Sequence, residues 1–172
     1  GTCTVVIDGK TVKTCVQKAE KFDGAHITTV EGLSDYEKNV YVYAFSTAGA
    51  VQCGFCTPGM VMCAKALLDQ NPAPNKVEIA AAIRGNYCRC TGYKKIVEAI
   101  QMAAEIFRGE KELPDVNTNN KMGESYRRVD AKEKILGTGE YCDDVEIDGM
   151  VYASPVRSKY PRAKILSIDT SD

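Results

Sequence analysis

Two short cysteine motifs carry the chemistry that this sequence could perform. They are Cys53-Gly54-Phe55-Cys56 and Cys88-Arg89-Cys90, and together they supply four thiols. Each motif falls between segments with helical patterns, where free backbone N–H groups can hydrogen-bond to sulfur and so suit an iron–sulfur cluster. Paired zinc ligands are usually separated by two or more residues, whereas the second motif has one. The spacing therefore favours one 2Fe-2S cluster on Cys53, Cys56, Cys88 and Cys90, with zinc as the alternative.

A second pair of thiols, Cys3 and Cys15, belongs to a segment with a hairpin pattern. Residues 3–16 alternate in polarity around Asp8-Gly9, a dipeptide typical of the tight turn between antiparallel strands. The two strands of a hairpin run back alongside each other, so these thiols could approach one another or share one metal. Two further ligands would be needed to complete a cluster there, so we expect either that the pair is structural or that the missing ligands precede Gly1.

Eight cysteines in one chain also raise the possibility of a disulfide scaffold. Such scaffolds are usually shorter than about 100 residues and poor in helix signals. This chain has 172 residues and is rich in helix signals, so we favour metal ligation. Cys63 lies among apolar neighbours of a helical segment and is expected to be a small buried side chain, while Cys142 lies far along the chain. The lone His26 has no partner at ligand spacing and is expected to be a surface histidine or one with its hydrogen bonds satisfied.

Four helices are expected around the first four of these cysteines. They cover about residues 36–48, 59–70, 76–84 and 94–107. Capping boxes at Ser34 with Glu37 and at Asn75 with Glu78 mark the starts of the first and third. Thr57-Pro58 is interpreted as the cap and first residue of the second. Residues 27–33 are expected to form a further strand running into a turn, so the four helices form a bundle beside a small sheet.

The remaining chain and the overall charge limit the possible functions. Residues 109–122 lack apolar periodicity and are expected to be a linker, after which short strands are expected from Arg127 onward. The net charge of −1, from 22 basic and 23 acidic residues, excludes the strong field that would gather nucleic acid or an anionic membrane. The apolar runs are far shorter than the roughly 20 residues that cross a bilayer. The chain has no initiator Met, and we expect that it is truncated at both ends.

The longer motifs around the cysteines resemble the iron–sulfur region of the molybdenum hydroxylases, the xanthine dehydrogenase and aldehyde oxidoreductase family. The matching segments are Gly1-Thr2-Cys3-Thr4-Val5, Val30-Glu31-Gly32-Leu33, Gln52-Cys53-Gly54-Phe55-Cys56-Thr57-Pro58-Gly59 and Asn86-Tyr87-Cys88-Arg89-Cys90-Thr91-Gly92-Tyr93. Past the linker, Arg127-Arg128-Val129-Asp130, Gly137-Thr138-Gly139-Glu140-Tyr141 and residues 163–169 resemble the start of the molybdenum-binding subunit. The family's Cys-x4-Cys-Gly-x-Cys motif implies that Cys3 and Cys15 are its last two ligands and that the first two precede Gly1.

The resemblance implies an α+β chain made of three parts. Residues 1–33 would be the C-terminal part of a β-grasp, plant-ferredoxin-like 2Fe-2S domain, and residues 34–108 a four-helix-bundle 2Fe-2S domain. After the linker at 109–122, residues 123–172 would be the first strands of an α/β hammerhead-like, molybdenum-binding domain. No flavin domain intervenes, as in the bacterial aldehyde oxidoreductases.

The resemblance also implies the function. The chain would relay electrons in an oxidoreductase that hydroxylates an aldehyde, a purine or another aromatic heterocycle with water as the oxygen source. Its cofactors would be two 2Fe-2S clusters and a molybdenum-pyranopterin, with Gln52 and Cys90 closest to the pterin. No catalytic residue is expected before Asp172, so this chain alone cannot perform the hydroxylation. Expected partners are the substrate, a separate electron-acceptor protein or flavin subunit, and further copies of the chain in a cytoplasmic homo-oligomer.

Two alternatives and one departure from the family accompany this interpretation. The first alternative is a zinc-stabilised helical interaction module without a redox role, and the second is a standalone ferredoxin-like carrier. Iron, zinc and molybdenum contents would separate these classes. The departure is Tyr43, which stands where relatives commonly carry a Gln before the pair Ala44-Phe45.

Overall fold

The computed structural model describes residues 1–114, 122–123 and 126–171 and divides them into two compact units. The first unit runs from Gly1 to Glu140 and contains every regular helix and strand of the described residues. The second begins at Tyr141. Seven of the eight cysteines, including those of both predicted metal sites, belong to the first unit.

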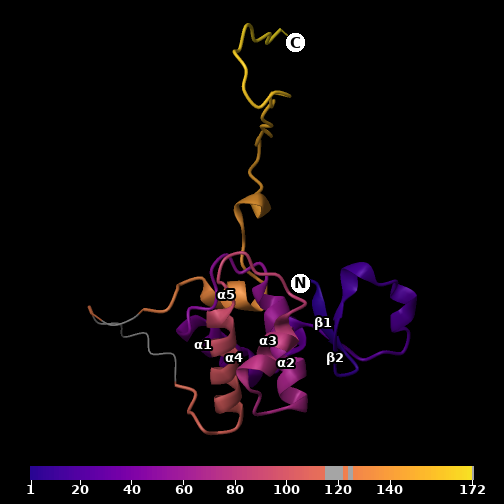
Figure 1. The fold of residues 1–172 in the computed structure, drawn as a ribbon, viewed down its shortest axis with the longest axis vertical. Coiled ribbons are helices and arrows are strands. Elements are labelled where there is room, and N and C mark those ends of the chain that lie inside the picture. The colour runs from indigo at the N-terminus through magenta and orange to yellow at the C-terminus, as the bar shows by residue number, and fades with distance from the viewer. Residues whose placement is uncertain (115–121, 124–125, 172) are drawn as a thin grey trace. The chain divides into compact units, whose positions relative to one another are not determined.

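A three-stranded antiparallel sheet begins the first unit (Figure 1). It consists of β1 (Thr4–Ile7), β2 (Lys10–Lys13) and β3 (Ile27–Thr28), in the order β2-β1-β3. Asp8 and Gly9 both have positive φ angles, of 48° and 77°, as the favoured two-residue hairpin turn requires. The predicted hairpin is confirmed. The strand expected over residues 27–33 is shorter than predicted, because a 3₁₀ turn at Val30–Gly32 follows β3.

Four helices follow the sheet at the predicted places. They are α1 (Asp35–Thr47), α2 (Thr57–Gln70), α3 (Lys76–Ile83) and α4 (Lys94–Phe107). Both predicted capping boxes are present, at Ser34 with Glu37 and at Asn75 with Glu78. The predicted cap of α2 is wrong, because Cys56 caps the helix and Thr57 is its first residue. Gly54 adopts a left-handed conformation with φ of 86°. The chain therefore turns before Cys56, and α2 can begin at Thr57.

The core of the first unit lies between these helices, and β1 packs against α2 (Figure 1). Tyr41 and Phe45 of α1 and Met60 of α2 are among the largest fully buried side chains. α2 carries buried residues on most of its circumference. A helix that is buried on several sides is a rigid support, so the loops at its ends are held in place.

A short fifth helix, α5 (Ala131–Leu136), was not predicted from the sequence. It packs against α1 and α2 and buries Ala131 and Ile135, which are spaced four residues apart on one face. The expectation of strands from Arg127 onward is therefore wrong for residues 131–136. Gly137 ends the helix in a left-handed conformation with φ of 80°. Part of the expected linker, residues 115–121, lies outside the described residues.

The second unit has little regular structure. Apart from a 3₁₀ turn at Cys142–Asp144, its described residues form neither helices nor strands, and their side chains are mostly exposed. A strand is stabilised when its N–H and C=O groups pair with a neighbouring strand, and residues 141–171 meet no such partner within the described part of the chain. The strands that we expected here are not formed. No helix among the described residues is long and apolar enough to cross a membrane.

Candidate metal centre

The first cysteine loop connects α1 to α2 and depends on Gly54. Its φ of 86° is one that side chains with a Cβ rarely adopt. The position also has no room for a side chain, because a Cβ on Gly54 would lie 2.6 Å from the Cβ of Lys134 in α5. The Gly54 carbonyl accepts a hydrogen bond from the Thr57 N–H at 3.1 Å, which closes the loop at the start of α2. Cys53 and Cys56 therefore project from a tight turn whose shape is fixed on both sides.

The second cysteine loop connects α3 to α4 and contains two consecutive left-handed residues. Gly92 and Tyr93 have φ angles of 64° and 68°, so α4 can begin directly after the loop. The Tyr93 hydroxyl accepts a hydrogen bond from the Cys88 N–H at 2.9 Å. The Thr91 hydroxyl lies 3.1 Å from the Cys88 sulfur. Strained backbone of this kind is concentrated at functional sites, where neighbouring contacts hold it.

The two loops meet, and their sulfur atoms lie in two pairs. Cys53 Sγ and Cys90 Sγ are 3.7 Å apart, and both residues are exposed. The Cys56 and Cys88 thiols lie close enough to shift each other's pKa, and Cys88 is only 7% exposed. Within the described residues, no three or more side chains of ligand type are placed to hold a single metal ion. Each pair combines one sulfur from each loop, so both loops are needed to form it.

The two inner thiols differ in acidity. Burial, together with the contact to Cys88, raises the pKa of Cys56 to about 12. Burial also raises the pKa of Cys88, but hydrogen bonds from Thr91 and the Cys90 N–H outweigh it, so that pKa lies below its usual value. Metal ligands must be thiolates, and metal binding at Cys56 would therefore release a proton.

Two pairs of sulfur atoms fit a 2Fe-2S cluster, in which each of two irons takes two cysteine thiolates. A single tetrahedral zinc with Zn–S bonds of about 2.3 Å would hold all four sulfurs about 3.8 Å from one another. The 3.7 Å between the Cys53 and Cys90 sulfurs suits two thiolates on one metal in either group.

Cys3 and Cys15 meet at the open end of the hairpin, as the sequence predicted. Their sulfur atoms are 3.1 Å apart. Hydrogen bonds from the Cys15 backbone and side chain lower the pKa of Cys3, and the same contact raises the pKa of Cys15. Cys63 is buried as expected, with its pKa raised by burial to about 11, and Cys142 lies in the second unit. His26 is exposed, as predicted.

Side chains next to the cysteines join the sheet to the helices, which the sequence did not predict. Thr2 donates a hydrogen bond from its hydroxyl to the Phe55 carbonyl at 2.5 Å. The Thr4 hydroxyl lies 2.6 Å from the Gly1 carbonyl oxygen and 2.8 Å from Asn86 Oδ1. Asn86 is 1% exposed and also contacts the Cys63 sulfur at 3.4 Å. The motifs around the cysteines contained these residues, but their types alone did not indicate partners.

The segment before α5 also contacts the first cysteine loop. Arg128 donates a hydrogen bond to the backbone carbonyl of Gln52, whose side chain is exposed. Arg127 lies over the ring of Tyr43, 4.7 Å from its centroid. This cation–π contact gives Tyr43 a structural role that the sequence did not suggest.

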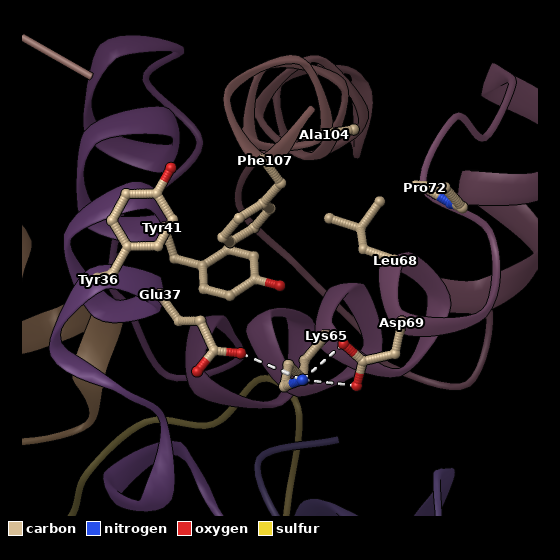
Figure 2. A pocket seen from close by; sticks show the side chains of 9 residues that line it. All are labelled: Tyr36, Glu37, Tyr41, Lys65, Leu68, Asp69, Pro72, Ala104 and Phe107. Carbon is tan, nitrogen blue, oxygen red and sulfur yellow. Dashed lines mark hydrogen bonds and ion pairs between the residues drawn. The ribbon is translucent and has the colours of Figure 1, made fainter. Parts of the chain in front are cut away.

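A pocket of about 250 Å³ lies away from the cysteines, between α1, α2 and α4 (Figure 2). Lys65 bridges Glu37 at 3.1 Å and Asp69 at 2.5 Å on one side of it. The Tyr41 hydroxyl is buried and has no hydrogen-bond partner among the described residues. The rings of Tyr36 and Tyr41 both pack edge-on against Phe107.

Four thiols on two meeting loops are the donor set of a 2Fe-2S binding protein, and comparisons with known proteins show such a region in this chain. The family model of the 2Fe-2S binding domain matches residues 29–101. The nicotinate dehydrogenase small FeS subunit of Eubacterium barkeri is 50% identical over 61% of this chain and 68% of its own length. The aldehyde oxidoreductase of Megalodesulfovibrio gigas is 38% identical over the whole chain, which spans 20% of that protein. The crystal structure of the aldehyde oxidoreductase from Desulfovibrio desulfuricans matches 84% of this chain and 17% of its own, with 39% identity and a TM-score of 0.73.

These relatives identify the chain at the level of its family. It belongs to the molybdenum hydroxylases, the oxidoreductases of the xanthine dehydrogenase and aldehyde oxidoreductase type, and carries their 2Fe-2S binding region. An iron–sulfur cofactor and an electron-transfer role follow from this membership.

Proposed function

We propose that this chain relays electrons within a molybdenum-pterin hydroxylase that oxidises an aldehyde, a purine or another aromatic heterocycle with water as the oxygen source. The domain arrangement of the proposal is a partial ferredoxin-like domain at 1–33, a helical cluster domain at 34–108, a linker at 109–122 and the start of a molybdenum-binding domain at 123–172. The similarity to an aldehyde oxidoreductase along the whole chain supports this order.

The proposed ligands of the helical-domain cluster are Cys53, Cys56, Cys88 and Cys90. The observation that carries this assignment is the pairing of one sulfur from each loop, with Cys53 and Cys90 3.7 Å apart and Cys56 against Cys88. When bound, a 2Fe-2S cluster accepts and releases single electrons. The protein's own contribution is to hold the four sulfurs through Gly54, Thr91 and Tyr93 and to shield Cys88 from water.

A second cluster is proposed at Cys3 and Cys15. Their 3.1 Å separation supports a shared site, and two further ligands would come from residues outside this chain. Cys3 and Cys15 lie in the same compact unit as the helical-domain cysteines.

The molybdenum-pyranopterin belongs to the same proposal, with Cys90 and Gln52 as the residues nearest to it. Both are exposed and therefore accessible to another domain. An amide side chain both donates and accepts hydrogen bonds in one plane, which suits the edge of a pterin ring. The proposal also includes a separate electron acceptor and a homo-oligomeric state. It places the protein in the cytoplasm, because thiols must stay reduced until the metal binds.

The content of iron, zinc and molybdenum in the intact protein tests this function. We expect two irons and two acid-labile sulfides for each complete cluster, a red-brown colour, and a paramagnetic signal after reduction. A colourless protein that contains zinc in place of iron would refute the proposal in favour of the zinc-stabilised interaction module.

A further inference from the structure

The pocket between α1, α2 and α4 contains a polar group that the described part of the chain does not satisfy. The Tyr41 hydroxyl is fully buried and has no hydrogen-bond partner among the described residues. Figure 2 shows it pointing away from α1, toward the space between Leu68 and Lys65. Buried polar groups are nearly always paired, and an unpaired one costs free energy. A molecule in the pocket that accepts a hydrogen bond from this hydroxyl would remove that cost.

The charged side chains of the pocket already bond to one another. The Lys65 ammonium donates to Asp69 Oδ1 and Oδ2 at 2.5 and 2.6 Å and lies 3.1 Å from Glu37 Oε1. Glu37 Oε2 accepts from the N–H and the hydroxyl of Ser34 at 2.8 and 2.6 Å. An ammonium group has three N–H donors, and these contacts occupy all of them. Among the described residues that line the pocket, Tyr41 is therefore the buried donor that remains available.

The charges around the pocket select a neutral ligand. Burial raises the pKa of Tyr41 far above its ordinary value, and the carboxylates of Glu37 and Asp69 raise it further. The phenol therefore stays protonated at neutral pH and can donate. An anion would meet two carboxylates and only one ammonium, that of Lys65, so it would be repelled. An organic ammonium ion has no acceptor atom for Tyr41.

The rest of the pocket is apolar and has room for an aromatic ring. Leu68, Pro72, Ala104 and the ring of Phe107 line it, and Tyr36, which is 53% exposed, lies where the pocket reaches the surface. An apolar cavity of about 150 Å³ is large enough for benzene, so this pocket of about 250 Å³ has room for a benzene ring with a small substituent. Aromatic side chains in the wall favour edge-on or offset contacts with such a ring.

We propose that this pocket binds a small neutral aromatic molecule carrying one hydrogen-bond acceptor, and that Tyr41 donates to that acceptor. Binding is reversible, and no covalent bond forms or breaks. The pocket is built by α1, α2, α4 and the turn after α2, so the site is additional to the cysteine loops. The inference goes beyond the electron-relay function and does not depend on iron.

The test uses two probes of matched shape in the intact protein. Acetophenone carries a carbonyl oxygen on its side chain, and α-methylstyrene has a methylene group in its place. Their affinities are measured by isothermal titration calorimetry for the wild type, Tyr41→Phe and Tyr43→Phe. Tyr43→Phe is the matched control, because Tyr43 lies on the same helix but packs against Arg127 outside the pocket. Circular dichroism checks that each variant is folded.

We expect the wild type to bind acetophenone about ten-fold more tightly than α-methylstyrene, because the hydrocarbon leaves the Tyr41 hydroxyl unpaired. Tyr41→Phe should remove this preference by weakening the binding of acetophenone while leaving that of α-methylstyrene unchanged. Tyr43→Phe should retain the preference. Benzoate, which has a similar size but a negative charge, should bind more weakly than acetophenone to the wild type.

Three results would overturn the inference. They are no binding of acetophenone up to its solubility limit, equal affinity of the wild type for both probes, and an unchanged affinity of Tyr41→Phe for acetophenone. The last result would mean that the probe binds elsewhere. If Tyr41→Phe does not fold, the comparison of the two probes on the wild type still decides. Because none of these measurements reads iron or electron transfer, failure of the proposed function would be seen separately.

Discussion

Gly54 and Lys134 lie against each other so closely that Gly54 cannot carry a side chain. A Cβ at position 54 would be 2.6 Å from Lys134 Cβ and 2.9 Å from its Cγ. The contact joins the first cysteine loop to α5, two segments that are far apart in the sequence. The shape of the loop therefore depends on a helix that lies beyond the expected linker.

Gly54→Ala should destabilise the protein and release iron. The φ of 86° is strained for alanine, and the Cβ would push α5 away, so we expect a cost of about 1–3 kcal/mol. Chemical denaturation and iron content would measure the two effects. Gly109→Ala, also at a positive φ of 74° but with open space around it, is the control and should lose stability without losing iron. Equal iron content in the two variants would contradict the role of Gly54.

Cys88→Ser should remove the signal of one of the two clusters. Serine cannot replace the sulfur that pairs with Cys56, so iron content should fall by about one cluster for each chain. Iron analysis and electron paramagnetic resonance are the measurements. Cys63→Ala is the control, because Cys63 is buried beside Asn86 and should cost about 1–2 kcal/mol of stability with no loss of iron. Iron loss in the control would mean that the ligands are wrongly assigned.

Tyr41→Phe should leave the fold intact and raise its stability. The Tyr41 hydroxyl is buried without a partner among the described residues, and an unsatisfied buried hydroxyl costs about 1–3 kcal/mol. Removing it keeps the ring contact with Phe107, whose centroid is 5.5 Å away. Urea unfolding would measure the change. A loss of stability in this variant would show instead that a bound water satisfies the hydroxyl.

Glu37 should make the stability depend on pH in the acidic range. Burial raises its pKa, but hydrogen bonds from Ser34 and Lys65 outweigh it and hold the pKa below the ordinary 4.5. A carboxyl group whose pKa is lower in the folded than in the unfolded state stabilises the fold at pH values above its unfolded-state pKa. This stabilisation is lost as the pH falls through the folded-state pKa. The stability difference between wild type and Glu37→Gln should therefore be constant near neutral pH and shrink below about pH 4.5. A difference that grows on acidification would contradict this sign.

Local signals in the sequence predicted most elements near the site. The capping boxes at Ser34 and Asn75 marked two helix starts. A capping box joins residues only three positions apart, so it can be recognised from the local sequence. The meeting of Cys3 and Cys15 followed from the geometry of a hairpin, again a local property.

The features that the sequence did not reveal depend on contacts between distant segments. α5 has only six residues, and its helical pattern rests on Ala131 and Ile135 alone. The partner of Tyr43 is Arg127, and that of Thr2 is Phe55. The motifs predicted that both cysteine loops share one site, but their spacing could not predict which sulfurs lie closest, Cys53 and Cys90.

The close approach of Gly59 in α2 to Gly1 has a consequence for the working protein. A Cβ at Gly59 would overlap the Gly1 carbonyl oxygen, so the main chains touch directly with no side chain between them. Backbone contact of this kind changes little when side chains switch rotamers. In the proposed electron relay, the spacing between the two cysteine sites would therefore be set by contact between main chains rather than by side-chain packing.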